Sequence, residues 1–388
     1  MSGTNRSYKF NGSISLEVLN NYLDRAIDCN IRGKGGKDYD PKFTDEIIRF
    51  ITNIGAKYVL RADGEWYPSI KFEQNFAVLT EKLAAAHKID PDIIFEASIF
   101  EVSSPEMKEI PIPEWVFEAF GQKPEKRCFN TDLTVFSDGY GVDYWEKGYH
   151  IPDITTREMQ MFVYYRACSL IDVGFEAFHL GQVLLTGRSD PQNIVYTKLI
   201  GMIREYAKTH ARRGYVIINA HNNNFKDTNG TMLVDMIVAP TRVHSDSKNE
   251  VNHAASEENP QRCIIEPGYW NDSIYCSNGP GTSPSGWHSD KYPYLVHLDN
   301  YGDTLGDTTD KDCYVWGRDE IGWYVNQPAW YRREFMKEIR EKIAGYNENG
   351  HIAAHGWSCG WGFFSNNKSE QCPNGSGDEE TIKKLFSE

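Results

Sequence analysis

The sequence of 388 residues predicts a (β/α)8 barrel, also called a TIM barrel, and three observations support this. Short apolar runs recur along the chain, and each ends in a polar or charged side chain. Segments with helical periodicity separate most of these runs. Long stretches without a regular pattern follow several of them, which is where a barrel carries the loops of its active face.

The apolar runs are the predicted strands. We expect them at residues 21–29, 57–63, 92–100, 175–182, 214–221, 294–299 and 351–356. Two further runs, 232–238 and 262–267, both have the composition of a strand, and no convincing helix separates residue 221 from residue 232.

The helices between the strands carry recognisable start signals, such as a capping residue followed by proline at the first helical position. Thr155 and Glu158 form a candidate capping box. We expect helices that begin after Asp40-Pro41, Thr155, Asp190-Pro191 and Pro328, and two more near residues 73–88 and 378–387.

A single barrel accounts for the whole chain, because a chain of this length can bury one large core. We therefore expect one domain over residues 1–388. Long insertions at about 102–153, 239–292 and 300–327 follow strand ends and contain many aromatic residues, which is typical of functional loops.

The net charge of −14 argues against nucleic acid or an anionic membrane as the main partner, since both favour basic patches. No apolar run is long enough to span a membrane. No signal peptide is visible, so location stays open between secretion after removal of such a peptide and the cytoplasm. The oligomeric state also stays open.

Successive side chains of a strand point to opposite faces, so alternation separates groups inside the barrel from groups that face the helices. Along 93–99, Glu96 and Ser98 alternate with apolar side chains and are expected inside. The expected inward groups are Asp63, Glu96, His179, His221, Asp235, Asp299 and His355, and polar groups at strand exits are Glu101, Gln182 and Glu266.

Carboxylates at several strand ends, together with tryptophans in loops, indicate glycoside hydrolysis, which requires a carboxylic acid and a second carboxylate. We expect Glu101 as general acid/base and Asp299 as nucleophile or base, with Glu266 as the substitute. The substrate is then an oligosaccharide or polysaccharide. The expected substrate-binding residues are Asp63, Trp66, His179, Gln182, His221, Asp319, Glu320 and Trp323, with the two tryptophans stacking on sugar rings.

Four segments carry a resemblance: IFEVSSPE (99–106), FHLGQV (178–183), LDNYGD (298–303) and WGRDEIGWYVNQP (316–328). In these the chain resembles barrel glycoside hydrolases and bacterial barrel proteins of unassigned function. The chain also departs from the largest clan of retaining barrel hydrolases, which places an Asn-Glu pair after the fourth strand. Gln182 stands there instead, so that clan's mechanism does not transfer directly.

Two alternatives remain open. No cofactor is expected for a hydrolase of this kind, but His179, His221, Asp235, Asp299 and His355 are also candidate ligands of one divalent metal in a sugar isomerase or hydrolase. The second alternative is a barrel that binds sugar without cleaving it. For Asp319 and Glu320, the structural alternative is that they begin a short helix.

Overall fold

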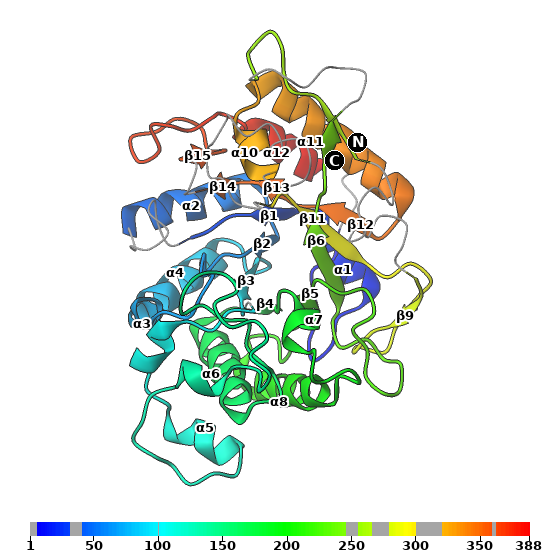
Figure 1. The fold of residues 1–388 in the computed structure, drawn as a ribbon. Coiled ribbons are helices and arrows are strands. Elements are labelled where there is room, and N and C mark those ends of the chain that lie inside the picture. The colour runs from blue at the N-terminus through cyan, green and yellow to red at the C-terminus, as the bar shows by residue number, and fades with distance from the viewer. Residues whose placement is uncertain are drawn as a thin grey trace.

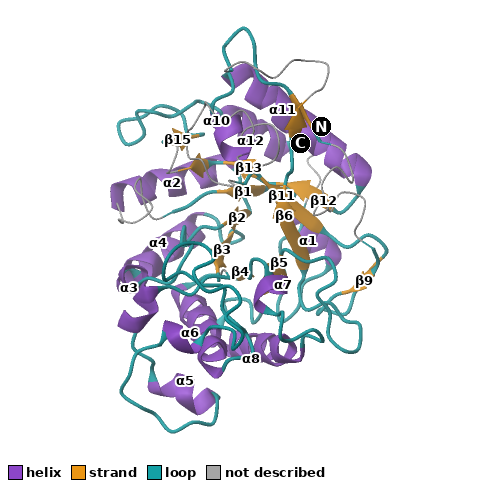
Figure 2. Cartoon of the chain, in the orientation of Figure 1, coloured by secondary structure: helices purple, strands orange, loops and turns teal. Residues whose placement is uncertain are grey.

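A ring of parallel strands forms the centre of the computed structural model, and helices surround it (Figure 1). Figure 2 shows the same arrangement by type of element, with strands inside and helices outside. The structure describes residues 6–31, 41–99, 101–245, 255–265, 279–299, 320–358 and 362–388. The ring of parallel strands with helices on its outside confirms the predicted (β/α)8 barrel.

The barrel strands follow one another in chain order, and each pairs in parallel with its neighbours. Their bounds are β1 Ala26–Asp28, β2 Tyr58–Leu60, β3 Ile94–Ser98, β4 Ala177–His179, β5 Ile217–Ala220, β6 Met236–Pro240, β11 Tyr294–His297, β12 Gly350–Ile352 and β13 Ala354–His355.

The last two of these strands together occupy the eighth position of the barrel. β12 pairs with β11, where Ile352 lies opposite Val296. β13 pairs with β1, where Ala354 lies opposite Ile27. Ala353 joins the two strands and donates its backbone N–H to Val296 O, so one continuous segment closes the ring.

Most strands are followed by helices that pack on the outside of the ring. The longer ones are α2 Pro41–Ile54, α4 Phe76–Ile89, α6 Arg157–Val173, α8 Ile194–His210, α11 Ala329–Tyr346 and α12 Glu379–Ser387. Shorter ones are α3 Ile70–Gln74, α5 Glu114–Ala119, α7 Val183–Thr186 and α10 Glu320–Val325. Residues 221–235 contain no helix, as the sequence indicated.

Three short antiparallel pairs lie outside the barrel sheet. They are β7 His244–Ser245 with β8 Cys263–Ile264, β9 Gly281–Thr282 with β10 His288–Ser289, and β14 Trp357–Ser358 with β15 Phe363–Phe364. The run at 262–267 therefore contributes to a hairpin-like pair, and the run at 232–238 leads into barrel strand β6.

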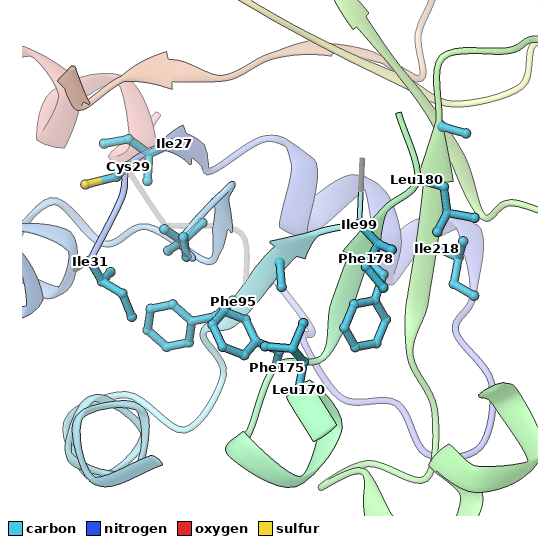
Figure 3. Packing of buried hydrophobic residues seen from close by; sticks show 14 of the residues in the cluster. Ile27, Cys29, Ile31, Phe95, Ile99, Leu170, Phe175, Phe178, Leu180 and Ile218 are labelled. Carbon is cyan, nitrogen blue, oxygen red and sulfur yellow. The ribbon is translucent and has the colours of Figure 1, made fainter. Parts of the chain in front are cut away.

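Two apolar layers hold the barrel together. The larger lies between strands and helices, and Figure 3 shows Phe95, Phe175 and Phe178 packed there with Leu170 of α6. The smaller fills the barrel interior from the amino-terminal end, where helix α1 (Leu16–Leu23) packs its buried side chains against strand residues such as Tyr58. The polar groups are thus left at the carboxyl-terminal end.

The predicted first strand at 21–29 is wrong in its first half. Ser15 caps α1 by accepting a hydrogen bond from Val18 N at 3.2 Å, and the helix continues through Leu23 before the strand starts at Ala26. A Ser cap followed by apolar residues at helical spacing is a recognisable helix signal.

Two helix starts also differ from expectation. Thr156, not Thr155, caps α6 and accepts from Met159 N. Glu158 does not complete a capping box, because its carboxylate binds Arg127. Asp190 accepts hydrogen bonds from the first backbone N–H groups of α8 even though the helix itself begins at Ile194.

Among the helices in the described ranges, none has the length and apolar composition that a membrane crossing requires.

Candidate functional site

The polar strand-end residues gather at the carboxyl-terminal mouth of the barrel. This follows from the topology, since every strand of the ring runs in the same direction. Alternation also holds for β3, β4 and β5. The side chains of Glu96, His179 and Asn219 lie inside the barrel, and their apolar neighbours Phe95, Phe178 and Ile218 pack against the helices.

Glu101 and Gln182 are hydrogen-bonded across the exits of β3 and β4. The backbone N–H of Gln182 donates to Glu101 Oε2 at 2.9 Å, and its side-chain amide donates to Oε1 at 3.0 Å. Glu101 is buried. Two oxygens held by one neighbouring residue give the carboxylate a defined orientation, as an acid/base group requires.

An aromatic cluster lies directly beside Glu101. We define the aromatic platform as Trp66, Tyr144 and Trp145, whose rings pack edge to face at 5.7 and 4.8 Å between centroids. The indole N–H of Trp145 donates to Glu101 O at 3.4 Å. Trp66 is 43% exposed and Tyr144 56% exposed, so the platform presents ring surface to solvent.

Arg61 occupies the mouth beside β1 and β11. Its backbone is left-handed at φ 48°, because the strand ends at Leu60 and the chain turns there. Its guanidinium forms two hydrogen bonds with the Asp28 carboxylate and donates to Leu298 O at 3.3 Å. It also lies 3.9 Å from Asp299 Oδ1. Asp299 retains 22% side-chain exposure and is therefore accessible from solvent.

Glu96 is the fully buried carboxyl group below the mouth. It accepts hydrogen bonds from Tyr58 Oη at 2.6 Å, Asn219 Nδ2 at 2.6 Å and Arg61 N at 3.3 Å. Burial raises the pKa of Glu96 to about 7, although these three donors lower it.

His179 and His221 lie with their rings against each other at the exits of β4 and β5. The two Nε2 atoms are 3.2 Å apart. His179 Nδ1 is 2.5 Å from Asn219 Oδ1, and His221 Nδ1 is 2.6 Å from Val238 O. His179 is buried, and burial followed by the charge of His221 lowers its pKa well below the usual range.

Two further histidines line the mouth. His297 of β11 is buried, its Nδ1 faces Leu298 O at 2.9 Å, and its ring stacks on that of His221 at 6.3 Å between centroids. His355 of β13 is buried, and neither ring nitrogen has a hydrogen-bond partner among the described residues. Burial lowers the pKa of His355 to about 4.

Two predicted substrate-binding residues belong to the interior of the protein. Trp323 is fully buried, donates its indole N–H to Gln261 O at 2.9 Å and packs against Tyr331 and Phe335. A stacking surface for sugar at Trp323 is not compatible with this burial.

Glu320 is also fully buried, and it begins helix α10, in agreement with the structural alternative. Its carboxylate accepts from Val243 N and Asp299 N, both at 3.0 Å, and so fixes the backbone on which Asp299 stands. Burial raises the pKa of Glu320 to about 8, while the Arg242 charge lowers it.

Asp63 and Asp235 are not directed into the mouth. Asp63 Oδ1 accepts from Ser98 N at 3.1 Å, and Oδ2 lies 3.8 Å from Arg166 of α6, so the carboxylate lies on the helix side of the ring. The expected inward orientation is wrong because Tyr58 and Leu60 face the barrel interior and Val59 faces the helices. Asp63 has the same parity as Val59, so it falls on the helix side.

Asp235 precedes the first residue of β6 and therefore lies toward the opposite end of the barrel. It accepts from Tyr215 Oη and Ile218 N and forms an ion pair with Arg204 at 3.1 Å. The expected metal set is thus not assembled with Asp235. Within the described ranges, no group of three or more His, Cys, Asp or Glu side chains has the spacing of a metal centre.

Glu266 and Asp319 lie outside the described residues. Conversely, several residues at the mouth were not among the predicted site residues, among them Asp28, Arg61, Trp145 and His297. Asp28 shares the inward side of β1 with Ala26, so alternation contains a signal for it. No sequence pattern indicates the turn that directs Arg61 over the mouth.

No protein-family model matches the sequence, and no curated protein matches it. Among solved structures, a debranching enzyme from Nostoc punctiforme is 9% identical over 94% of this chain and 81% of that chain, with a TM-score of 0.46. The glycoside hydrolase domain of PelA from Pseudomonas aeruginosa is 6% identical over 79% and 90%, with a TM-score of 0.37. Ribulose-1,5-bisphosphate carboxylase/oxygenase from Pyrococcus horikoshii is 9% identical over 88% and 56%, with a TM-score of 0.34. Similarities this distant assign no activity to the chain.

Proposed function

We propose that the protein is a carbohydrate-active enzyme, specifically a glycoside hydrolase that acts on an oligosaccharide or polysaccharide. The contact between the aromatic platform and Glu101 carries this proposal. Exposed indole and phenol rings offer flat apolar faces on which the faces of a sugar ring can stack. The hydrogen bond from Trp145 to the backbone carbonyl oxygen of Glu101 fixes those rings beside the residue that carries the carboxylate.

In this proposal Glu101 is the general acid/base, and Gln182 sets the orientation of its carboxyl group. Asp299 is the second carboxylate, because it stands at the exit of β11 and is accessible from solvent. Whether it attacks the sugar directly or activates a water depends on the separation of the two carboxyl groups. Glu266 remains the substitute for this second role.

The remaining polar groups of the mouth are suited to binding sugar hydroxyl groups. His221 is half-buried and has ring N–H and lone-pair functions, and Arg61 offers a guanidinium beside Asp299.

A panel of oligosaccharides and polysaccharides with product analysis tests the proposal. The wild type is compared with Glu101→Gln and Asp299→Asn, which keep size and remove the carboxylate. Loss of a catalytic acid or base lowers kcat by about 100-fold to 10,000-fold. Glu146→Gln and Asp290→Asn are matched controls at exposed positions and should retain activity.

Cleavage that persists in the Asp299→Asn variant would remove Asp299 from the catalytic role and direct attention to Glu266. Glycan binding without cleavage in the wild type, with unchanged affinity in both carboxylate variants, would instead establish the barrel as a sugar-binding protein.

A further inference from the structure

We propose that His179 and His221 bind one divalent transition-metal ion between their Nε2 atoms. The site lies at the carboxyl-terminal mouth of the barrel, at the exits of β4 and β5. This inference goes beyond the proposed function and does not depend on it, since metal binding is measurable whether or not any glycan is cleaved.

The spacing of the two nitrogens fits a metal ion. Their separation is 3.2 Å. Zinc binds imidazole nitrogen at about 2.0–2.1 Å. One ion equidistant from the two nitrogens would therefore have an N–Zn–N angle of about 100–106°. This angle is close to the tetrahedral value that zinc adopts in proteins.

The hydrogen bonds on the far side of each ring leave a lone pair on each Nε2. His221 Nδ1 faces the carbonyl oxygen of Val238 at 2.6 Å, and His179 Nδ1 faces Asn219 Oδ1 at 2.5 Å. An oxygen of either kind accepts a hydrogen bond, so each Nδ1 carries the proton. In a neutral ring the lone pair is then on Nε2.

The orientation of the Asn219 amide is fixed independently. Its Nδ2 donates to Glu96 Oε2 at 2.6 Å, which leaves Oδ1 for His179. A carboxylate, an amide and an imidazole therefore follow one another toward the Nε2 position. Histidine ligands of protein metal ions almost always donate their other N–H to an oxygen in this way, which fixes the tautomer and the ring orientation.

One metal ion at about 2.0–2.1 Å from both Nε2 atoms would accept both lone pairs. Imidazole nitrogens favour zinc, nickel and copper over magnesium and calcium, which prefer oxygen ligands. His221 is half-buried, so the ion has access from the mouth. With two protein ligands, the remaining coordination positions belong to water or to a substrate oxygen.

A shared proton is the other acceptor that fits between the nitrogens, and the experiment distinguishes the two. The full chain is stripped with a chelator and dialysed against Zn²⁺ alone, with Mg²⁺ as the comparison ion. The variants are His221→Gln and, as matched control, His210→Gln. His210 is exposed and pairs with Asp172 at 3.0 Å. It is the last residue of α8, which leads to the start of β5, and the mouth lies at the other end of that strand.

We expect the wild type and His210→Gln each to bind one equivalent of Zn²⁺ more than His221→Gln binds. We expect no such additional equivalent with Mg²⁺. The affinity of the site for Zn²⁺ should fall at least tenfold in His221→Gln, because one of the two ligands is lost. With Cu²⁺ as probe, electron paramagnetic resonance should report two nitrogen ligands in the wild type.

Equal Zn²⁺ stoichiometry and affinity in the wild type and His221→Gln would overturn the proposal. So would a wild type that binds no Zn²⁺ and whose ¹⁵N imidazole resonances show a proton shared by His179 and His221. Because His221 is half-buried, circular dichroism of His221→Gln should match that of the wild type. His179→Gln serves as a second variant, which should give the same loss of Zn²⁺ if it folds.

Discussion

Gln182 holds both carboxylate oxygens of Glu101, one through its backbone N–H at 2.9 Å and the other through its side-chain amide at 3.0 Å. The two residues come from the exits of neighbouring strands, so the barrel itself sets their separation. Gln182 stands at a position where a carboxylate was expected, and its role there follows from these two hydrogen bonds. It positions Glu101.

Gln182→Ala should lower kcat on any glycan substrate by about 10- to 100-fold while changing KM little. The backbone hydrogen bond remains, but the side-chain one is lost, and the carboxyl group becomes free to rotate away from its productive orientation. Steady-state kinetics of the variant measures this split. Gln160→Ala, on α6 and bonded only to Thr155 O in the described structure, is the control. A larger effect on KM than on kcat would assign Gln182 to substrate binding instead.

Trp66→Ala should weaken glycan binding and leave stability nearly unchanged. The side chain is 43% exposed and contacts Trp145 and Tyr67 at ring edges, so little core is lost. Loss of one stacking surface costs about 1–2 kcal/mol, or about 5- to 30-fold in Kd. Calorimetry with an oligosaccharide ligand measures it. Trp115→Ala, 36% exposed on α5, should bind as the wild type does.

Trp323→Ala should behave in the opposite way. Its fully buried indole packs on Tyr331 and Phe335, so truncation leaves a cavity and a carbonyl of Gln261 without its donor. Substitutions of this kind destabilise proteins by about 3–5 kcal/mol. Urea unfolding measures the loss. An unfolding free energy within about 1 kcal/mol of the wild type would contradict the assignment of Trp323 to the core.

Alternation predicted the interior correctly in β3 and β4. It separated Glu96 from Phe95, and it placed His179 inside while Phe178 packs against the helices. It failed at β2, where Asp63 was expected inside, although Tyr58 and Leu60 are the residues that face the interior. At the end of this strand Arg61 adopts a left-handed conformation that no neighbouring residue indicates.

The sequence also did not predict which aromatic side chains are exposed. Trp66 and Trp323 are each followed by a tyrosine in a segment that was expected to be a loop, yet one is exposed at the mouth and the other is buried under α11. Burial of a single tryptophan depends on which distant segments cover it, and local pattern carries no information on that contact. The same reason hid the contact of Trp145 with Glu101.

His355 makes the stability of the protein depend on pH. Its ring is stacked on Phe363 and faces the edge of Tyr324, both at 5.8 Å between centroids, and no residue in the described part of the chain forms a hydrogen bond with its nitrogens. Burial lowers its pKa to about 4, the Asp28 charge opposes this shift, and the Arg61 and Arg332 charges add to it. In the unfolded chain His355 has a pKa near 6.5. As the pH falls below 6.5, His355 is therefore protonated in the unfolded chain while it stays neutral in the folded protein. The stability is fully present above pH 6.5 and is lost as the pH falls from 6.5 toward 4.

His355→Phe removes the titrating group and keeps an aromatic ring between Phe363 and Tyr324. We expect the free energy of unfolding of the variant to fall less than that of the wild type between pH 7 and pH 4.5, by about 2–3 kcal/mol. His87 and His351 also have a pKa lowered to about 4, but both proteins contain them, so their effect cancels in the comparison. Urea unfolding of both proteins at the two pH values measures the difference. If wild type and variant lose the same stability on acidification, His355 takes up its proton in the folded protein as readily as in the unfolded chain.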